Sequence, residues 1–94
     1  MRVRWLRKAL QNLAGEAEYI TRNDPVAAAH MVARMSEAVE RLSSFPALGR
    51  PGRVVGTREL VVTGTPYIIP YRVRGGGVEI LRVFHAARKW PERL

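Results

Sequence analysis

The spacing of apolar side chains changes near the middle of this chain, and that change restricts the fold more than any other feature. Between residues 6 and 43 apolar residues recur at intervals of three and four, which predicts two amphipathic helices. After residue 57 they alternate with polar residues, which predicts strands. We therefore expect an α+β fold in which an N-terminal antiparallel helical hairpin packs on one face of a three- to four-stranded antiparallel β-sheet. At 94 residues, the chain is expected to form one domain spanning 1–94.

The two helices are separated by a break at Asp24 and Pro25. Asp24 can accept hydrogen bonds from the free amides of the next turn, and Pro25 has the φ angle that suits a first helical position. The first helix is expected to begin at Leu6 and the second to end near Ser43. Before them, Val3–Trp5 is a candidate for a short first strand.

The second half is predicted to be a meander, because its strands are joined by short glycine-containing turns. Pro70 falls inside the middle strand and predicts a bulge, or a strand with one unpaired side, at that point. Ile80, Arg82 and Phe84 are expected to share one face of the last strand. The expected segments are a Gly/Pro-rich loop at Phe45–Gly56, strands at Thr57–Thr63, Pro66–Arg74 and Val78–His85, and a helical turn or loose tail at Ala86–Leu94.

Positive charge is concentrated in the strand half of the chain. Nine basic and three acidic side chains lie in residues 45–94, against seven and five in residues 1–44, and the whole chain carries a net charge of +8. Strand alternation should collect several arginines and aromatic residues on one sheet face, which suits nucleic acid or an acidic protein segment. The alternative is a solvated face with ordinary cross-strand pairs. The candidate contact residues are Arg58, Tyr71, Arg72, Arg82, Arg88 and Trp90.

Composition excludes several classes of function. The absence of cysteine removes disulfides, thiolate nucleophiles and Cys-ligated zinc, and fits a reducing compartment. Two separated histidines give no credible metal site, and the chain has neither a Walker loop nor a dinucleotide fingerprint, so we expect no cofactor and no metal. No apolar run is long enough to span a bilayer, so we expect a cytoplasmic protein without a membrane partner.

His85 is the one candidate for acid–base chemistry, because its ordinary pKa lies nearest neutrality. Together with Arg72, it could support metal-free RNA cleavage in which an arginine stabilises the pentavalent phosphate and His85 protonates the leaving oxygen. A lone histidine at a strand end more commonly closes the strand by a hydrogen bond to the backbone. His85 and Arg72 are therefore catalytic candidates only if the protein is a nuclease.

In the order and spacing of five short motifs, the sequence resembles toxins of the RelE/ParE superfamily over nearly the whole chain. The resemblance implies one half of a type II toxin–antitoxin pair, in which a cognate antitoxin neutralises the toxin through an acidic segment and forms a hetero-oligomer with it. RelE-like members cut mRNA in the ribosomal A site, whereas ParE-like members inhibit DNA gyrase. The five motifs are Phe45–Arg50, Gly56–Val62, Tyr67–Val73, Val78–His85 and Arg88–Pro91.

One position separates the two activities. RelE-like nucleases carry an arginine three residues before the tyrosine that corresponds to Tyr71, and this chain has Ile68 there. An isoleucine cannot stabilise a phosphorane, so the resemblance favours the ParE-like side, with gyrase as the target. The alternatives are a RelE-like, ribosome-dependent mRNA endoribonuclease, or a degenerate toxin that acts only as a binding module.

Overall fold

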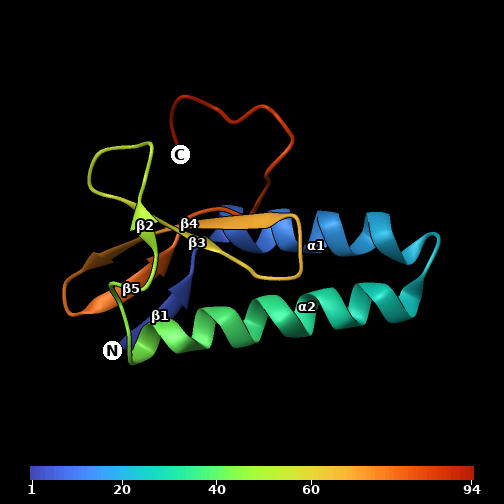
Figure 1. Cartoon of the computed structure of the whole chain (residues 1–94), viewed down its shortest axis with the longest axis horizontal. Helices are drawn as coiled ribbons and strands as arrows, with labels where there is room; N and C mark the ends of the chain where they lie inside the picture. Colours follow the sequence, from blue (N-terminus) through green and yellow to red (C-terminus); the bar gives the residue numbers. More distant parts are fainter.

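The computed structural model describes residues 1–94 and places two helices against one sheet (Figure 1). The helical segments are α1 (Arg7–Thr21), α2 (Pro25–Glu40) and the 3₁₀ turn η1 (Arg41–Ser43). The strands are β1 (Arg2–Trp5), β2 (Arg50–Pro51), β3 (Arg58–Val61), β4 (Tyr67–Arg74), β5 (Gly77–Ile80) and β6 (Phe84–His85). The predicted α+β class and helical hairpin are confirmed. No helix is both long and apolar enough to cross a membrane.

The break between the helices has the predicted chemistry. The Asp24 carboxylate accepts a hydrogen bond from the Ala27 amide at 3.0 Å, and Pro25 occupies the first position of α2. The chain thereby reverses direction in a few residues, and α1 and α2 lie side by side on the same side of the sheet (Figure 1).

The sheet is larger than predicted, and it is mixed. Its six strands follow the order β1-β5-β4-β3-β2, with β6 also pairing with β4. The expectation of three or four antiparallel strands was wrong because β1 pairs with β5 in parallel, with Val3 opposite Val78 and Trp5 opposite Ile80. A parallel pair needs a long crossover, and here the helical hairpin and most of the sheet lie between the two strands. Local spacing carries no information about so distant a partner.

The last predicted strand, Val78–His85, is interrupted by a bulge. Tyr71 pairs with Ile80, and Ile68 pairs with Phe84. The two residues of β4 between these pairs therefore face three residues, 81–83, between β5 and β6. Pro70 lies opposite this bulge, where its carbonyl accepts from the Leu81 amide at 2.9 Å. Because the extra residue shifts the alternation, Ile80 and Phe84 lie on opposite faces of the sheet, not on one face as predicted.

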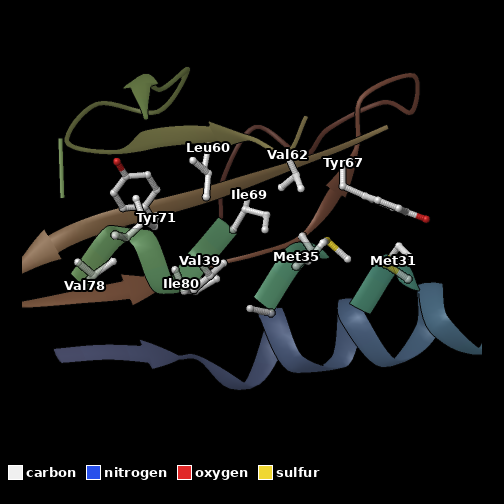
Figure 2. Close-up of a cluster of buried hydrophobic side chains, with 13 residues drawn as sticks. Met31, Met35, Val39, Leu60, Val62, Tyr67, Ile69, Tyr71, Val78 and Ile80 are labelled. Atoms are coloured by element: carbon white, nitrogen blue, oxygen red, sulfur yellow. The ribbon is translucent and has the colours of Figure 1, made fainter. Parts of the chain in front are cut away.

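The core lies between the helices and one face of the sheet. Figure 2 shows side chains of β3, β4 and β5 meeting Met31, Met35 and Val39 of α2. The other face, which we call the open face, receives the alternate side chains of the same strands. The strand half of the chain contributes Leu60, Val62, Tyr67, Ile69, Tyr71, Val78, Ile80 and Val83 to the core cluster, of which Val62 and Val83 lie just outside the strands.

Candidate functional site

An ion-paired row crosses the open face on β1, β5 and β4. Register places Arg4 and Arg72 on either side of Glu79. Arg4 donates to one oxygen of that carboxylate at 2.7 Å, and Arg72 donates to the other at 2.6 Å. The hydrogen bond from Arg72, followed by that from Arg4, holds the pKa of Glu79 below its usual value. The row carries two positive charges and one negative charge, so it remains cationic.

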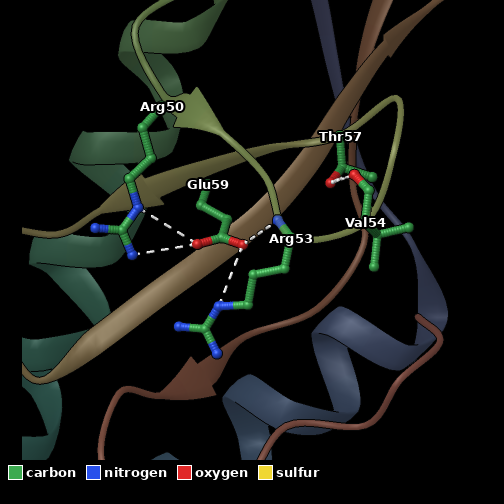
Figure 3. Close-up of polar contacts among 5 residues, drawn as sticks. All are labelled: Arg50, Arg53, Val54, Thr57 and Glu59. Carbon is green, nitrogen blue, oxygen red and sulfur yellow. Dashed lines mark hydrogen bonds and ion pairs between the residues drawn. The ribbon is translucent and has the colours of Figure 1, made fainter.

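A second carboxylate between arginines fixes the loop after β2. Glu59 of β3 is only 3% exposed, and Arg50 donates to one of its oxygens at 3.2 Å (Figure 3). The backbone amide of Arg53 donates to the other oxygen at 2.8 Å, and the Arg53 guanidinium lies 3.6 Å from it. Within the loop, the Thr57 hydroxyl donates to the Val54 carbonyl at 2.6 Å. These contacts hold Arg53 at a fixed place beside the open face.

The C-terminal segment, Ala86–Leu94, returns to the sheet through Trp90. The Arg53 guanidinium lies 3.6 Å from the centre of the Trp90 ring, and Phe84 packs on Trp90 with ring centres 4.7 Å apart. In Figure 1 this segment arches over the side of the sheet that faces away from α2. The segment has neither helix nor strand; the Ala86 amide donates to the Pro66 carbonyl at 2.8 Å at its start, and the contacts of Trp90 hold it further along.

Arg88 ties the start of the same segment to α1. It donates to Glu16 at 2.9 Å, and the Glu16 side chain is only 14% exposed. Burial, and then the neighbouring Glu16 carboxylate, raise the pKa of Tyr67 to about 12. The ring of His85 meets Tyr67 edge-on with centres 5.7 Å apart, and His85 Nδ1 accepts from the Ala87 amide at 3.1 Å. His85 thus contacts the backbone through Nδ1, while its Nε2 has no hydrogen-bond partner within the chain.

A small pocket lies beneath the C-terminal segment. It has a volume of about 200 Å³, and Arg82 enters it with its Nε donating to Asn12 Oδ1 at 2.8 Å. Two buried polar atoms in the pocket lining, Glu16 Oε1 and Trp90 Nε1, make no hydrogen bond within the chain. Buried polar atoms are normally paired, so these two atoms are exceptions within this fold.

The structure brings four of the predicted site residues together. Arg82, His85, Arg88 and Trp90 all line the pocket under the C-terminal segment. Arg72 lies on the open face in the row with Glu79.

Two other predicted contacts point toward the helix side of the sheet. Tyr71 is fully buried, and its hydroxyl accepts from the Gly49 amide at 2.8 Å and donates to the Pro46 carbonyl at 2.7 Å. Arg58, paired with Tyr71 in the sheet, donates to the Gly49 carbonyl at 2.8 Å. Both side chains hold the loop that follows α2.

Sequence reasoning missed Asn12, Glu16 and Arg53. For the first two a signal existed, because they lie three and seven residues after the buried Ala9, on the stripe of α1 that faces the protein. A polar side chain at such a position needs a partner, and here the partners are arginines from the distant end of the chain. Arg53 lies in an irregular loop, where spacing gives no orientation.

Comparison with known proteins identifies relatives across the whole chain. Residues 3–90 match the model of the ParE toxin family of the type II toxin–antitoxin system parDE. The chain is 52% identical to the protein Y4kP of Sinorhizobium fredii, over 99% of this chain and 96% of that protein. It is 40% identical to toxin RelE2 of Caulobacter vibrioides, over 89% and 93%. A solved structure of the chromosomal ParDE toxin–antitoxin system from P. aeruginosa superposes with a TM-score of 0.83, at 31% identity, over 90% of this chain and 95% of that one.

Proposed function

The chain belongs to the ParE toxin family of type II toxin–antitoxin systems, and from this premise we propose that it arrests growth by binding DNA gyrase. As a toxin of such a pair it has an antitoxin as its partner. The similarity to a toxin named RelE2 leaves RNA cleavage as the competing activity, so the choice between the two depends on the site.

The observation that carries the proposal is that the chain lacks the nuclease arginine and holds its other candidate arginines in ion pairs with carboxylates. Ile68, at the position of the nuclease arginine, is buried against the rest of the fold. His85 Nδ1 accepts from a backbone amide, while Arg72 and Arg88 are each paired with a carboxylate. Stabilising a pentavalent phosphate needs an arginine that is free to contact it, and both candidate arginines are held by carboxylates. An arrangement of fixed cations instead supports binding to a partner.

We assign the gyrase contact to the C-terminal segment and the pocket beneath it. Arg88 and Trp90 are held by Glu16 and Arg53, so their geometry exists before the partner arrives. Ordering a long side chain at an interface costs about 0.5–1.5 kcal/mol, and a side chain already fixed in the free protein avoids most of this cost. Arginine and tryptophan are also the residues that most often dominate binding energy at protein interfaces.

Ribosome-dependent mRNA cleavage is the second candidate, and one observation favours it. Glu16, Tyr67, His85 and Arg88 form a single cluster of ionisable groups. With a pKa of about 12, Tyr67 stays protonated at neutral pH and could only donate a proton. This reading therefore needs a base from outside the cluster or from His85 after rearrangement.

Paired assays on the purified toxin, freed of its antitoxin, test the proposal. One assay follows supercoiling of relaxed plasmid by gyrase, and the other follows cleavage of mRNA on programmed ribosomes. We expect inhibited supercoiling and intact mRNA. Arg88→Ala should weaken inhibition at least tenfold, whereas Arg22→Ala, on the exposed end of α1, should not. Cut mRNA with normal supercoiling would replace the proposal with the nuclease reading.

His85→Ala separates the two activities further. Because His85 closes a strand end, its loss should lower stability modestly and leave gyrase inhibition by the folded protein within a few-fold of wild type. Under the nuclease reading the same change should reduce cleavage by about 10²–10⁴-fold. A folded His85→Ala protein that inhibits gyrase normally supports binding, and one that loses inhibition contradicts it.

A further inference from the structure

Four arginines form a compact group on the open face, at the end of the sheet away from the C-terminal segment. Arg4 and Arg72 lie in the row with Glu79, and the next row places Arg2 and Arg74 on either side of Gly77. Side chains two residues apart along a strand are about 7 Å apart, and β1 and β4 are about 10 Å apart because one strand lies between them. Glu79 is the only acidic residue in these two rows, so the group carries an excess of positive charge.

This arginine patch, defined as Arg2, Arg4, Arg72 and Arg74, is open to solvent. The Arg4 side chain is 66% exposed, and Arg2 and Arg74 are exposed and make no ion pair. Gly77 contributes no side chain to the gap between them, and the hairpin that carries Arg74 projects at the left of Figure 1, away from the C-terminal segment.

We propose that the arginine patch binds the phosphate backbone of duplex DNA. Guanidinium groups bind phosphate oxygens in a bidentate manner, and a flat sheet face presents several of them at once. The proposal goes beyond gyrase inhibition and does not depend on it, because the patch and the C-terminal segment occupy different parts of the open face.

The composition of the patch argues against a protein partner. Stable protein interfaces have an apolar centre, but Val73, the exposed apolar residue between Arg72 and Arg74, belongs to the other face by strand alternation. The composition also argues against single-stranded RNA, which is recognised mainly by stacking on aromatic rings. The aromatic rings of this face, Phe84 and Trp90, pack on each other, and Arg53 lies over Trp90.

Substitution of Glu79 should change DNA affinity in the opposite direction to substitution of the arginines. Its carboxylate occupies the guanidinium groups of Arg4 and Arg72, which a phosphate would otherwise contact. Glu79→Gln should release both arginines and strengthen DNA binding. Substitution of the free pair, Arg2→Gln with Arg74→Gln, should weaken it.

The experiment measures fluorescence anisotropy of a labelled, mixed-sequence DNA duplex with the purified toxin over a series of salt concentrations. Each phosphate contact contributes about 0.9 to the slope of log K against log salt. The Arg2→Gln/Arg74→Gln protein should therefore show a slope smaller by about 2. Between roughly 50 and 200 mM salt, the fold-loss of DNA affinity should be about 12 times smaller in this variant than in wild type. Arg7→Gln/Arg22→Gln removes the same charge from the exposed surface of α1 and should keep the wild-type slope.

Several results would overturn the inference. Equal losses in the two double variants would mean that binding follows net charge alone. Equal competition by poly-glutamate would identify an acidic protein surface as the partner, and tighter binding of single-stranded RNA through the same arginines would exclude the duplex. Unchanged or weaker DNA binding by Glu79→Gln would also contradict the inference. Tighter DNA binding with a steeper slope of log K against log salt supports it. Gyrase inhibition by these variants is scored separately, so failure of the DNA proposal leaves the proposed function intact.

Discussion

Replacing Tyr71 with phenylalanine removes one oxygen atom from the centre of the fold and leaves the aromatic packing in place. That oxygen accepts from the Gly49 amide at 2.8 Å and donates to the Pro46 carbonyl at 2.7 Å. Because Tyr71 and Gly49 are both buried, the Gly49 amide cannot turn to water without moving the loop, whereas the Pro46 carbonyl is only half-buried. An ideal Cβ on Gly49 would lie 2.6 Å from the Tyr71 ring, so the loop is also closely packed there.

The expected loss of stability follows from these two bonds. Each net hydrogen bond contributes about 1 kcal/mol, and leaving a buried partner unpaired adds to the loss, so Tyr71→Phe should cost about 2–3 kcal/mol. For a chain of this size that corresponds to a fall in Tm on the order of 10 °C. Urea and thermal unfolding followed by circular dichroism measure the loss, and hydrogen exchange at the Gly49 amide should accelerate by a similar free energy.

The matched control is Tyr19→Phe, whose side chain is 60% exposed and which should leave stability unchanged. Gyrase inhibition per folded molecule should stay near wild type in both variants, because neither hydroxyl lies at the C-terminal segment. A Tyr71→Phe protein within about 0.5 kcal/mol of wild type would refute the reasoning, since that is the range of ordinary surface substitutions. Normal stability with lost binding would instead make Tyr71 a partner contact.

Three further predictions concern the C-terminal segment. Glu16→Arg or Arg88→Glu alone should weaken gyrase inhibition at least tenfold, and the double exchange should restore most of it. If a titration of supercoiling shows no recovery in the double variant, Glu16 does not act by positioning Arg88. Because the pKa of Tyr67 is raised from 10.0 to about 12, its contribution is complete below pH 10 and lost as pH rises toward 12. Unfolding free energy should fall more over that interval in wild type than in Tyr67→Phe. Arg53→Ala should uncover Trp90, seen as faster exchange of its indole N–H by NMR, and an unchanged rate would show that the stacking holds nothing.

The helical half of the fold could be predicted because its signals are local. Apolar spacing defines both helices, and Asp24 with Pro25 supplies a cap and a fixed φ at the break. The strands could be located for the same reason. Their pairing could not, since the parallel partner of Val3 is Val78, far along the chain, and nothing near either residue specifies the other.

The candidate site shows a related limit of sequence reasoning. Charge and residue type selected Arg88 and Trp90 as candidates, because both are side chains that favour partner contacts. The same criteria selected Tyr71, whose hydroxyl serves the backbone in the core. Residue type indicates which interactions a side chain can make, and only the fold decides whether they are made inside the protein. Glu16, which sequence reasoning missed, shows the converse, since a carboxylate on the apolar stripe of α1 needs a partner inside the protein.

Two carboxylates, Glu79 and Glu16, hold arginines on the proposed binding surfaces, and the expected sign of a carboxylate substitution depends on what else holds the arginine. Arg4 and Arg72 lie on paired strands, so their backbone positions persist without Glu79, and the carboxylate mainly competes with an incoming phosphate. Removing it should therefore strengthen anion binding. Arg88 lies in a segment without regular structure, and Glu16 is the contact that fixes its side chain. There the loss of order should outweigh the gain in positive charge. Glu16→Gln should therefore weaken binding to gyrase, even though it makes the protein more basic. If simple net charge governed both surfaces, the two substitutions would change affinity in the same direction.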